Sequence, residues 1–80
     1  MHQFIERIIV NPKILGGKPI IKGTRIPIYI IIQMLRDGAT FEKIIKEYPR
    51  LKVIDIQSVL DYSMYLIKGD NEEEISLKIE

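Results

Sequence analysis

The chain has 80 residues, a formal net charge of +1, 46% hydrophobic residues, one histidine and no cysteine. A chain of this length forms one small domain, and the lack of cysteine excludes a disulfide framework, a thiol nucleophile and a thiolate zinc site. No apolar run approaches the roughly 20 residues that span a bilayer, and the N-terminus lacks the features of a signal peptide, so we expect a cytoplasmic protein with no membrane partner.

The charge is divided unevenly along the chain. Residues 1–52 hold ten Lys/Arg against four Asp/Glu, a balance of +6, and residues 53–80 hold two Lys/Arg against seven Asp/Glu, a balance of −5. A basic part of this kind can hold a polyanion, and an acidic part can hold a basic or metal-bearing partner. An ordinary surface with scattered charges explains the same counts.

The first quarter of the chain predicts short strands joined by turns. FIERIIV, residues 4–10, is typical of a strand, and the Asn11-Pro12 pair closes it. Residues 19–21 and 24–26 predict further short extended segments. Four glycines are expected at turns, where they allow a positive φ or a close backbone approach: Gly16, Gly17, Gly23 and Gly38.

The glycines and lysines of this stretch do not fit a nucleotide-binding loop. Counting on from Gly17, the position of the P-loop Gly-Lys-Thr is taken by Lys22-Gly23-Thr24, in which lysine and glycine are in the wrong order. The dinucleotide fingerprint is also missing. Tight turns before a helix are therefore the preferred interpretation.

Two helices are predicted next. The first covers residues 27–37, because Pro27 suits a first turn and Gly38 a helix stop. Its core stripe is Ile28, Ile31, Ile32 and Leu35, with Ile30 and Met34 outside the stripe. The second covers residues 41–48, with Thr40 as its cap and Pro49 after its end. Its inward face is Phe41, Ile44, Ile45 and Tyr48.

A third and longer helix is predicted over residues 53–68, with Gly69 as its stop. Its core stripe is Ile56, Val59, Leu60, Ser63 and Ile67. Other apolar residues widen the apolar faces beyond what one small domain buries. We therefore expect at least a homodimer, through Ile30, Met34, Tyr62 and Leu66.

Residues 70–80 are predicted to form an acidic tail outside the domain of residues 1–69. Within this tail Ile75, Leu77 and Ile79 alternate with polar residues, which is a strand pattern. Such a strand either adds to the N-terminal strand or pairs with another chain. A frayed tail is the alternative interpretation.

A short helix, a four-residue link and a longer helix, preceded by another helix, form the order of a helix-turn-helix unit. In that arrangement four cations would face phosphates and two polar residues would reach base edges: Lys43, Lys46, Arg50 and Lys52, and Gln57 and Ser58. Asp55 and Asp61 argue against DNA binding, because carboxylates repel phosphate. Three-helix packing without nucleic acid explains the pattern equally well.

Catalysis and metal binding are not indicated. The chain has no cysteine and no internal histidine, and the carboxylates of residues 72–74 have no apolar pocket that would raise a pKa. Adjacent carboxylates on an unstructured chain are also not preorganised for a metal ion. We expect no enzyme, no cofactor and no small-molecule substrate.

Over residues 7–62 the chain closely resembles the domain of unknown function 433 family. The matching features are the block GGKPIIKGTRIP, followed by a helix, Gly38, a helix ending in YP and then L…DI…L.Y. The resemblance implies a mainly α, homeodomain-like helix-turn-helix module of three helices with short N-terminal β-strands. It also implies an antitoxin of VapB-like type, encoded next to a small PIN-like ribonuclease toxin. The sequence departs from the family where a hydroxyl residue commonly caps the third helix, since Lys52 stands there, and Ile54 replaces a usual acid.

The resemblance implies that the protein neutralises a PIN-like toxin by direct binding and binds its operator DNA in a secondary role. A PIN-like active site is a carboxylate cluster around a divalent metal, so cations near the glycine turns are candidate contacts. The candidate toxin contacts are Lys18, Lys22, Arg25, Ile75, Leu77 and Ile79. Two alternatives remain: Arg25 pairs with Asp37 or Glu6 within the fold, or the protein is a free-standing DNA-binding regulator without a toxin.

Overall fold

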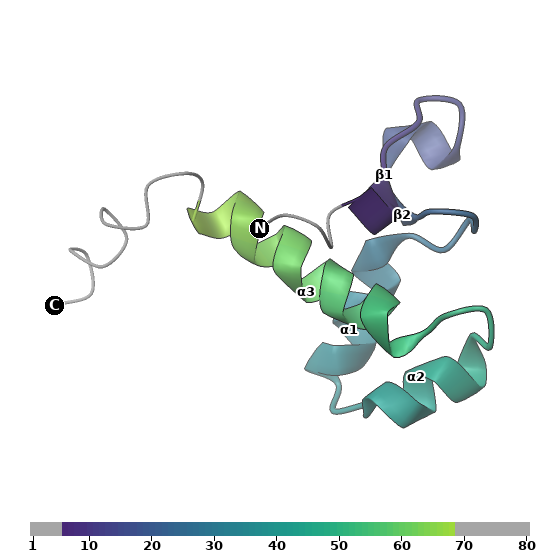
Figure 1. The fold of residues 1–80 in the computed structure, drawn as a ribbon, viewed down its shortest axis with the longest axis vertical. Coiled ribbons are helices and arrows are strands. Elements are labelled where there is room, and N and C mark those ends of the chain that lie inside the picture. The colour runs from purple at the N-terminus through teal and green to yellow at the C-terminus, as the bar shows by residue number, and fades with distance from the viewer. Residues whose placement is uncertain (1–5, 69–80) are drawn as a thin grey trace, which may run out of the picture.

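Three helices and a two-stranded antiparallel sheet form the fold, which confirms the predicted mainly helical module with short N-terminal strands (Figure 1). The structure is a computed structural model that describes residues 6–68. Along the chain the elements are β1 (Ile8–Ile9), the 3-10 turn η2 (Leu15–Gly17), β2 (Ile20–Ile21), α1 (Ile28–Arg36), α2 (Phe41–Glu47) and α3 (Val53–Lys68). The predicted strand over residues 75–79 and the expected stop at Gly69 lie outside the described residues.

The sheet is shorter than the sequence predicts. Ile8 pairs with Ile21 and Ile9 with Ile20, while residues 6 and 7 form a 3-10 turn and residues 4 and 5 lie outside the described part. Ile20 also bridges to Pro27, and the Ile28 N–H donates to the Pro19 carbonyl at 2.9 Å. These contacts connect the sheet directly to the first turn of α1.

The predicted helix ends are confirmed at α1 and α2. After α1, the Gly38 N–H donates to the Leu35 carbonyl and the Ala39 N–H to the Met34 carbonyl, at 3.0 and 2.9 Å. This pair of bonds is a Schellman motif, and Gly38 provides the positive φ of 91° that it requires. At the start of α2, the Lys43 N–H donates to Thr40 Oγ1 at 3.1 Å, so Thr40 is the cap.

The core lies between α1, α2, α3 and the sheet. Its buried hydrophobic members are Ile8, Ile20, Ile21, Ile28, Ile31, Ile44, Leu51, Ile56 and Val59. Phe41, Ile45 and Tyr48 pack against it partly buried, which agrees with the predicted inward face of α2.

Three residues predicted for the core are exposed instead: Ile32, Leu60 and Ile67. The buried face of α1 is turned toward Met34, which packs against the core although we expected it outside the stripe. The far half of α3 extends beyond the other helices, so they do not cover Ile67, which is 74% exposed (Figure 1).

Two of the four residues predicted to join a second copy are unsuited to that role. Met34 and Tyr62 are partly buried and pack against the chain's own core. Leu66 is exposed, and Ile30 is partly exposed. The apolar surface that the fold leaves open therefore differs from the one that the sequence indicated.

Candidate macromolecule-binding surface

Residues 22–25 form a tight loop that the Thr24 side chain holds in shape. Thr24 Oγ1 donates to the Ile21 carbonyl at 2.7 Å and accepts from the Ile26 N–H at 3.0 Å. Gly23 has a φ of 80°, which glycine adopts without strain, and a Cβ at this position would meet open space. Gly23 is therefore needed for its backbone conformation and not for close packing, and the same holds for the other three predicted turn glycines, Gly16, Gly17 and Gly38.

Arg50, from the link between α2 and α3, reaches this loop. Its Nη2 donates to the Gly23 carbonyl at 3.3 Å, across 27 positions of sequence. The two arginines and the loop border one open groove, which is lined by Ile9, Ile14, Gly23, Thr24, Arg25 and Arg50. The groove holds about 460 Å³, ample for a phosphate or a carboxylate group. Arg50 and Arg25, which we had assigned to DNA and to a toxin respectively, thus lie at the same site.

Arg25 is exposed, and within residues 6–68 no ion pair joins it to Asp37 or Glu6. Asp37 pairs with its neighbour Arg36 instead, at 3.0 Å between Oδ1 and Nε. That hydrogen bond raises the pKa of Arg36, but both side chains lie at the surface, where such pairs contribute little stability. The predicted internal pairing of Arg25 is therefore not found in the described part of the chain.

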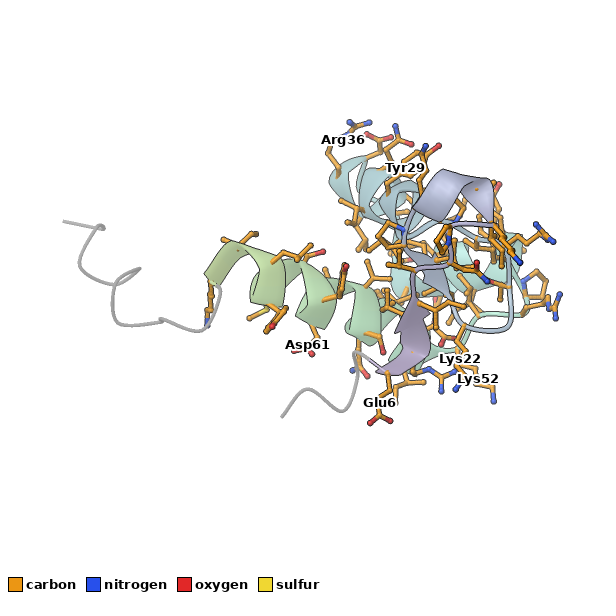
Figure 2. All side chains as sticks on the ribbon, turned by 90° about the horizontal axis from the view of Figure 1, so that it is seen from above. Glu6, Lys22, Tyr29, Arg36, Lys52 and Asp61 are labelled. Atoms are coloured by element: carbon orange, nitrogen blue, oxygen red, sulfur yellow. The ribbon has the colours of Figure 1, made fainter. Side chains whose placement is uncertain are left out.

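The remaining candidate cations are exposed on several elements. Lys43 and Lys46 lie on α2, where they line a hollow together with Glu47. Lys22 and Lys52 extend from one side of the molecule, the side that also carries Glu6 (Figure 2). Lys18 is exposed just after η2. The candidate toxin contacts Ile75, Leu77 and Ile79 lie outside the described residues.

Asp55 caps the start of α3 and so replaces the hydroxyl residue that is missing at position 52. Its Oδ2 accepts from the Lys52 N–H at 2.8 Å, the half of a capping box in which the third helical residue reaches back. Its Oδ1 accepts from Arg7 Nε at 2.6 Å, and the residue is buried. Asp55 therefore presents no free carboxylate to a phosphate, and that argument against DNA binding does not hold for this residue.

Ser58 is not a base-reading residue, contrary to the prediction. It is completely buried, and its hydroxyl donates to the Ile54 carbonyl at 2.7 Å. It lies one helical turn from Asp55, on the core side of α3 next to Val59. Gln57 is exposed and remains the one candidate of the pair.

Sequence reasoning missed the residues that position the surface, namely Arg7, Thr24 and Asp55. A signal existed for Asp55, because an acid at the third helical position is where a capping box places its carboxylate. The ion pair between Asp55 and Arg7 spans 48 positions of sequence, and no local sequence pattern predicts it.

Within residues 6–68 there is no group of three His, Asp or Glu residues that could hold a metal ion. None of the helices in the same range is both long enough and apolar enough to cross a membrane. Exposed guanidinium and ammonium groups in this range can bind anionic groups of a partner.

The chain belongs to the DUF433 family, described as "Protein of unknown function", whose pattern matches residues 8–63. The uncharacterized protein y4eO of Sinorhizobium fredii is 31% identical over 58 residues, which are 72% of this chain and 26% of that protein. An uncharacterized protein of Archaeoglobus fulgidus is 58% identical over 24 residues, 30% of this chain and 67% of that protein. The chain thus spans about a quarter of the Sinorhizobium relative.

A solved structure has the same fold. The crystal structure of a DUF433 member from Anabaena variabilis superposes with a TM-score of 0.67 at 27% identity. The match covers 91% of this chain and 67% of that one. These two comparisons establish the family and the fold of the chain.

Proposed function

We propose that the protein is an antitoxin that neutralises a PIN-like ribonuclease toxin by direct binding. The observation that carries the proposal is the convergence of Arg25 and Arg50 on one groove. Guanidinium groups bind carboxylates in a bidentate manner and keep their charge at every physiological pH. The family resemblance implies a partner whose active site is a carboxylate cluster around a divalent metal, and an exposed arginine carries the complementary charge.

The loop is also prepared for binding before a partner arrives. The two Thr24 hydrogen bonds fix residues 21–26, and the Lys22 N–H donates to the Arg7 carbonyl at 2.8 Å, so the backbone next to Arg25 is already ordered. A preformed contact loses less conformational entropy on association. Arg25 is thus supported as the side chain that enters the carboxylate cluster.

An inhibition assay tests this proposal. The neighbouring gene is examined for a small PIN-like ribonuclease, which is purified where one is encoded, and RNA cleavage is measured against increasing concentrations of the protein. Arg25→Ala is expected to raise the half-inhibitory concentration at least about tenfold, as expected for a central interface arginine. Arg36→Ala is the matched control, because it removes an exposed guanidinium outside the groove. Absence of inhibition by the unaltered protein would reject the proposal.

DNA binding is the second candidate function, either as the secondary role of an antitoxin or as the role of a regulator without a toxin. The order α2, link, α3 and the exposed cations Lys43, Lys46, Arg50 and Lys52 favour it. Base reading has little support, because Ser58 is buried and Gln57 is the only polar candidate left.

The DNA proposal predicts binding dominated by phosphate contacts. Replacing Lys46 and Arg50 with alanine should weaken binding to all duplex sequences alike, as measured by fluorescence anisotropy. Affinity for duplex DNA that does not exceed affinity for a neutral polymer at low salt would remove this function.

A further inference from the structure

The groove beside the Thr24 loop has an apolar part as well as a basic part. Its apolar lining comes from Ile9 on β1 and from Ile14, just before η2. Ile8 and Ile21 pack into the main core, and side chains alternate between the two faces of a strand. Ile9 therefore points to the opposite face of the sheet, where it is partly buried.

Backbone hydrogen bonds hold Ile14 in place. Its N–H donates to the Asn11 carbonyl at 2.8 Å, and its carbonyl accepts from the Gly17 N–H at 3.0 Å. The Asn11 side chain also accepts from the Lys13 N–H at 2.9 Å, which closes an Asx turn. The apolar part of the groove is therefore ordered before a ligand binds, like the loop that carries Arg25, and this lowers the entropy cost of binding.

The basic part consists of two guanidinium groups, and no carboxylate of the described residues lines the groove. Arg25 is exposed, and Arg50 uses one N–H for the Gly23 carbonyl. A guanidinium carries several N–H donors, so both arginines can bind a ligand. Thr24 cannot donate to that ligand, because its hydroxyl already donates to the Ile21 carbonyl. The side-chain donors that the groove offers are therefore charged, and they favour an anion.

We propose that the groove binds an acidic segment of a partner protein, in which an aliphatic side chain lies next to a carboxylate side chain. Arg25 and Arg50 bind the carboxylate, and Ile9 and Ile14 contact the aliphatic side chain. The groove holds about 460 Å³, which lies within the range of roughly 300–1,000 Å³ that is usual for binding sites and leaves room for a side chain beside the carboxylate.

A phosphate group fits this lining less well than such a segment. It would bind the guanidinium groups but leave the two isoleucines exposed to water, whereas an aliphatic neighbour removes their surface from water. A nucleic acid also gains its affinity from many phosphate contacts along its backbone, and two cations line the groove. Charge and apolar surface together therefore favour a protein segment.

Nuclear magnetic resonance titration of the full, isotope-labelled chain with short blocked peptides tests the groove. We expect acetyl-Gly-Asp-Leu-Gly-amide to shift the backbone amide signals of Ile9, Ile14 and residues 22–25, with a dissociation constant in the millimolar range. Asn in place of Asp, or Ala in place of Leu, should each raise this constant at least about threefold, because the first change removes the charge and the second the apolar contact. Equal binding of the three peptides, or inorganic phosphate that binds as tightly at the same ionic strength, overturns the proposal.

Variants of the chain test the two parts of the groove separately. Arg25→Gln should weaken binding of the Asp-Leu peptide at least about threefold, and Arg36→Gln is the matched control, because Arg36 lies outside the groove. Ile9→Thr keeps a β-branched residue in the strand and should remove the preference for Leu over Ala in the peptide. Ile14→Thr is the second variant, with the same expected result. A preference that persists in the folded variants overturns the apolar contact.

The inference rests on the proposed function only for the identity of the partner, and the outcomes of the two experiments are distinct. Peptide binding as described, without inhibition of a toxin, rejects the antitoxin and supports the groove as a site for an acidic segment. Inhibition of a toxin without any shift of the groove signals by the peptide rejects the groove inference alone.

Discussion

Asp55 holds two parts of the molecule together, and its replacement should cost much of the stability. Asp55→Ala removes the acceptor for the Lys52 N–H, which is worth about 1 kcal/mol for a helix cap. It also removes a charged hydrogen bond to Arg7, worth about 1.5–3 kcal/mol. The Arg7 side chain is 39% exposed and can be hydrated once it is alone, so the lower part of that range applies. We expect a total loss of about 2–3 kcal/mol.

Thermal unfolding followed by circular dichroism measures this loss. In a domain of this size about 1 kcal/mol lowers Tm by roughly 4–8 °C, so Asp55→Ala should lower it by about 10–20 °C. Asp55→Asn keeps an acceptor for the cap but loses the charge, and its effect should be intermediate. Thr40→Ala, which removes a single exposed cap, sets the scale at about 1 kcal/mol. If Asp55→Ala costs no more than Thr40→Ala, the ion pair with Arg7 contributes nothing and the reasoning is refuted.

Three further outcomes are expected. For DNA, the slope of log K against log salt should be about −3 to −4 per subunit for four phosphate contacts, and a slope near zero would contradict a phosphate-dominated complex. Ser58→Ala should leave DNA affinity unchanged within about twofold, because the hydroxyl is buried, whereas an effect larger than that of Gln57→Ala would contradict the assignment. Truncation after Gly69 should leave a cooperative thermal transition and reduce toxin inhibition at least about tenfold, and full inhibition by the truncated chain would move the contact to Lys18, Lys22 and Arg25.

Much of the fold could be predicted because its signals are local. Gly38 after α1 and Thr40 before α2 act within a few residues of their own positions, and both were placed correctly. The bounds of the three helices were predicted to within about one residue. Periodicity was less informative for α3, because both sides of that helix carry apolar residues and only the packing shows which side is buried.

The site could be predicted only in part, because its geometry depends on contacts between distant residues. The cations were identified from their charge, but nothing local shows that Arg50 reaches the carbonyl of Gly23. Ser58 was misassigned because a serine early in a recognition helix is a reasonable reader if it faces outward. Its orientation follows from the position of Asp55, whose burial next to Arg7 fixes the rotation of α3 about its axis.

The proposed toxin contact and the proposed DNA contact share part of one surface, and this constrains the function. Arg50 lines the groove together with Arg25, and it is also one of the four cations assigned to phosphate contacts. A carboxylate cluster bound in the groove would therefore compete with phosphate for Arg50. Arg25 is exposed next to the ordered Thr24 loop, whereas Ser58 is buried and cannot contact a base. The described surface is therefore better suited to capturing a carboxylate cluster through Arg25 than to reading a DNA sequence.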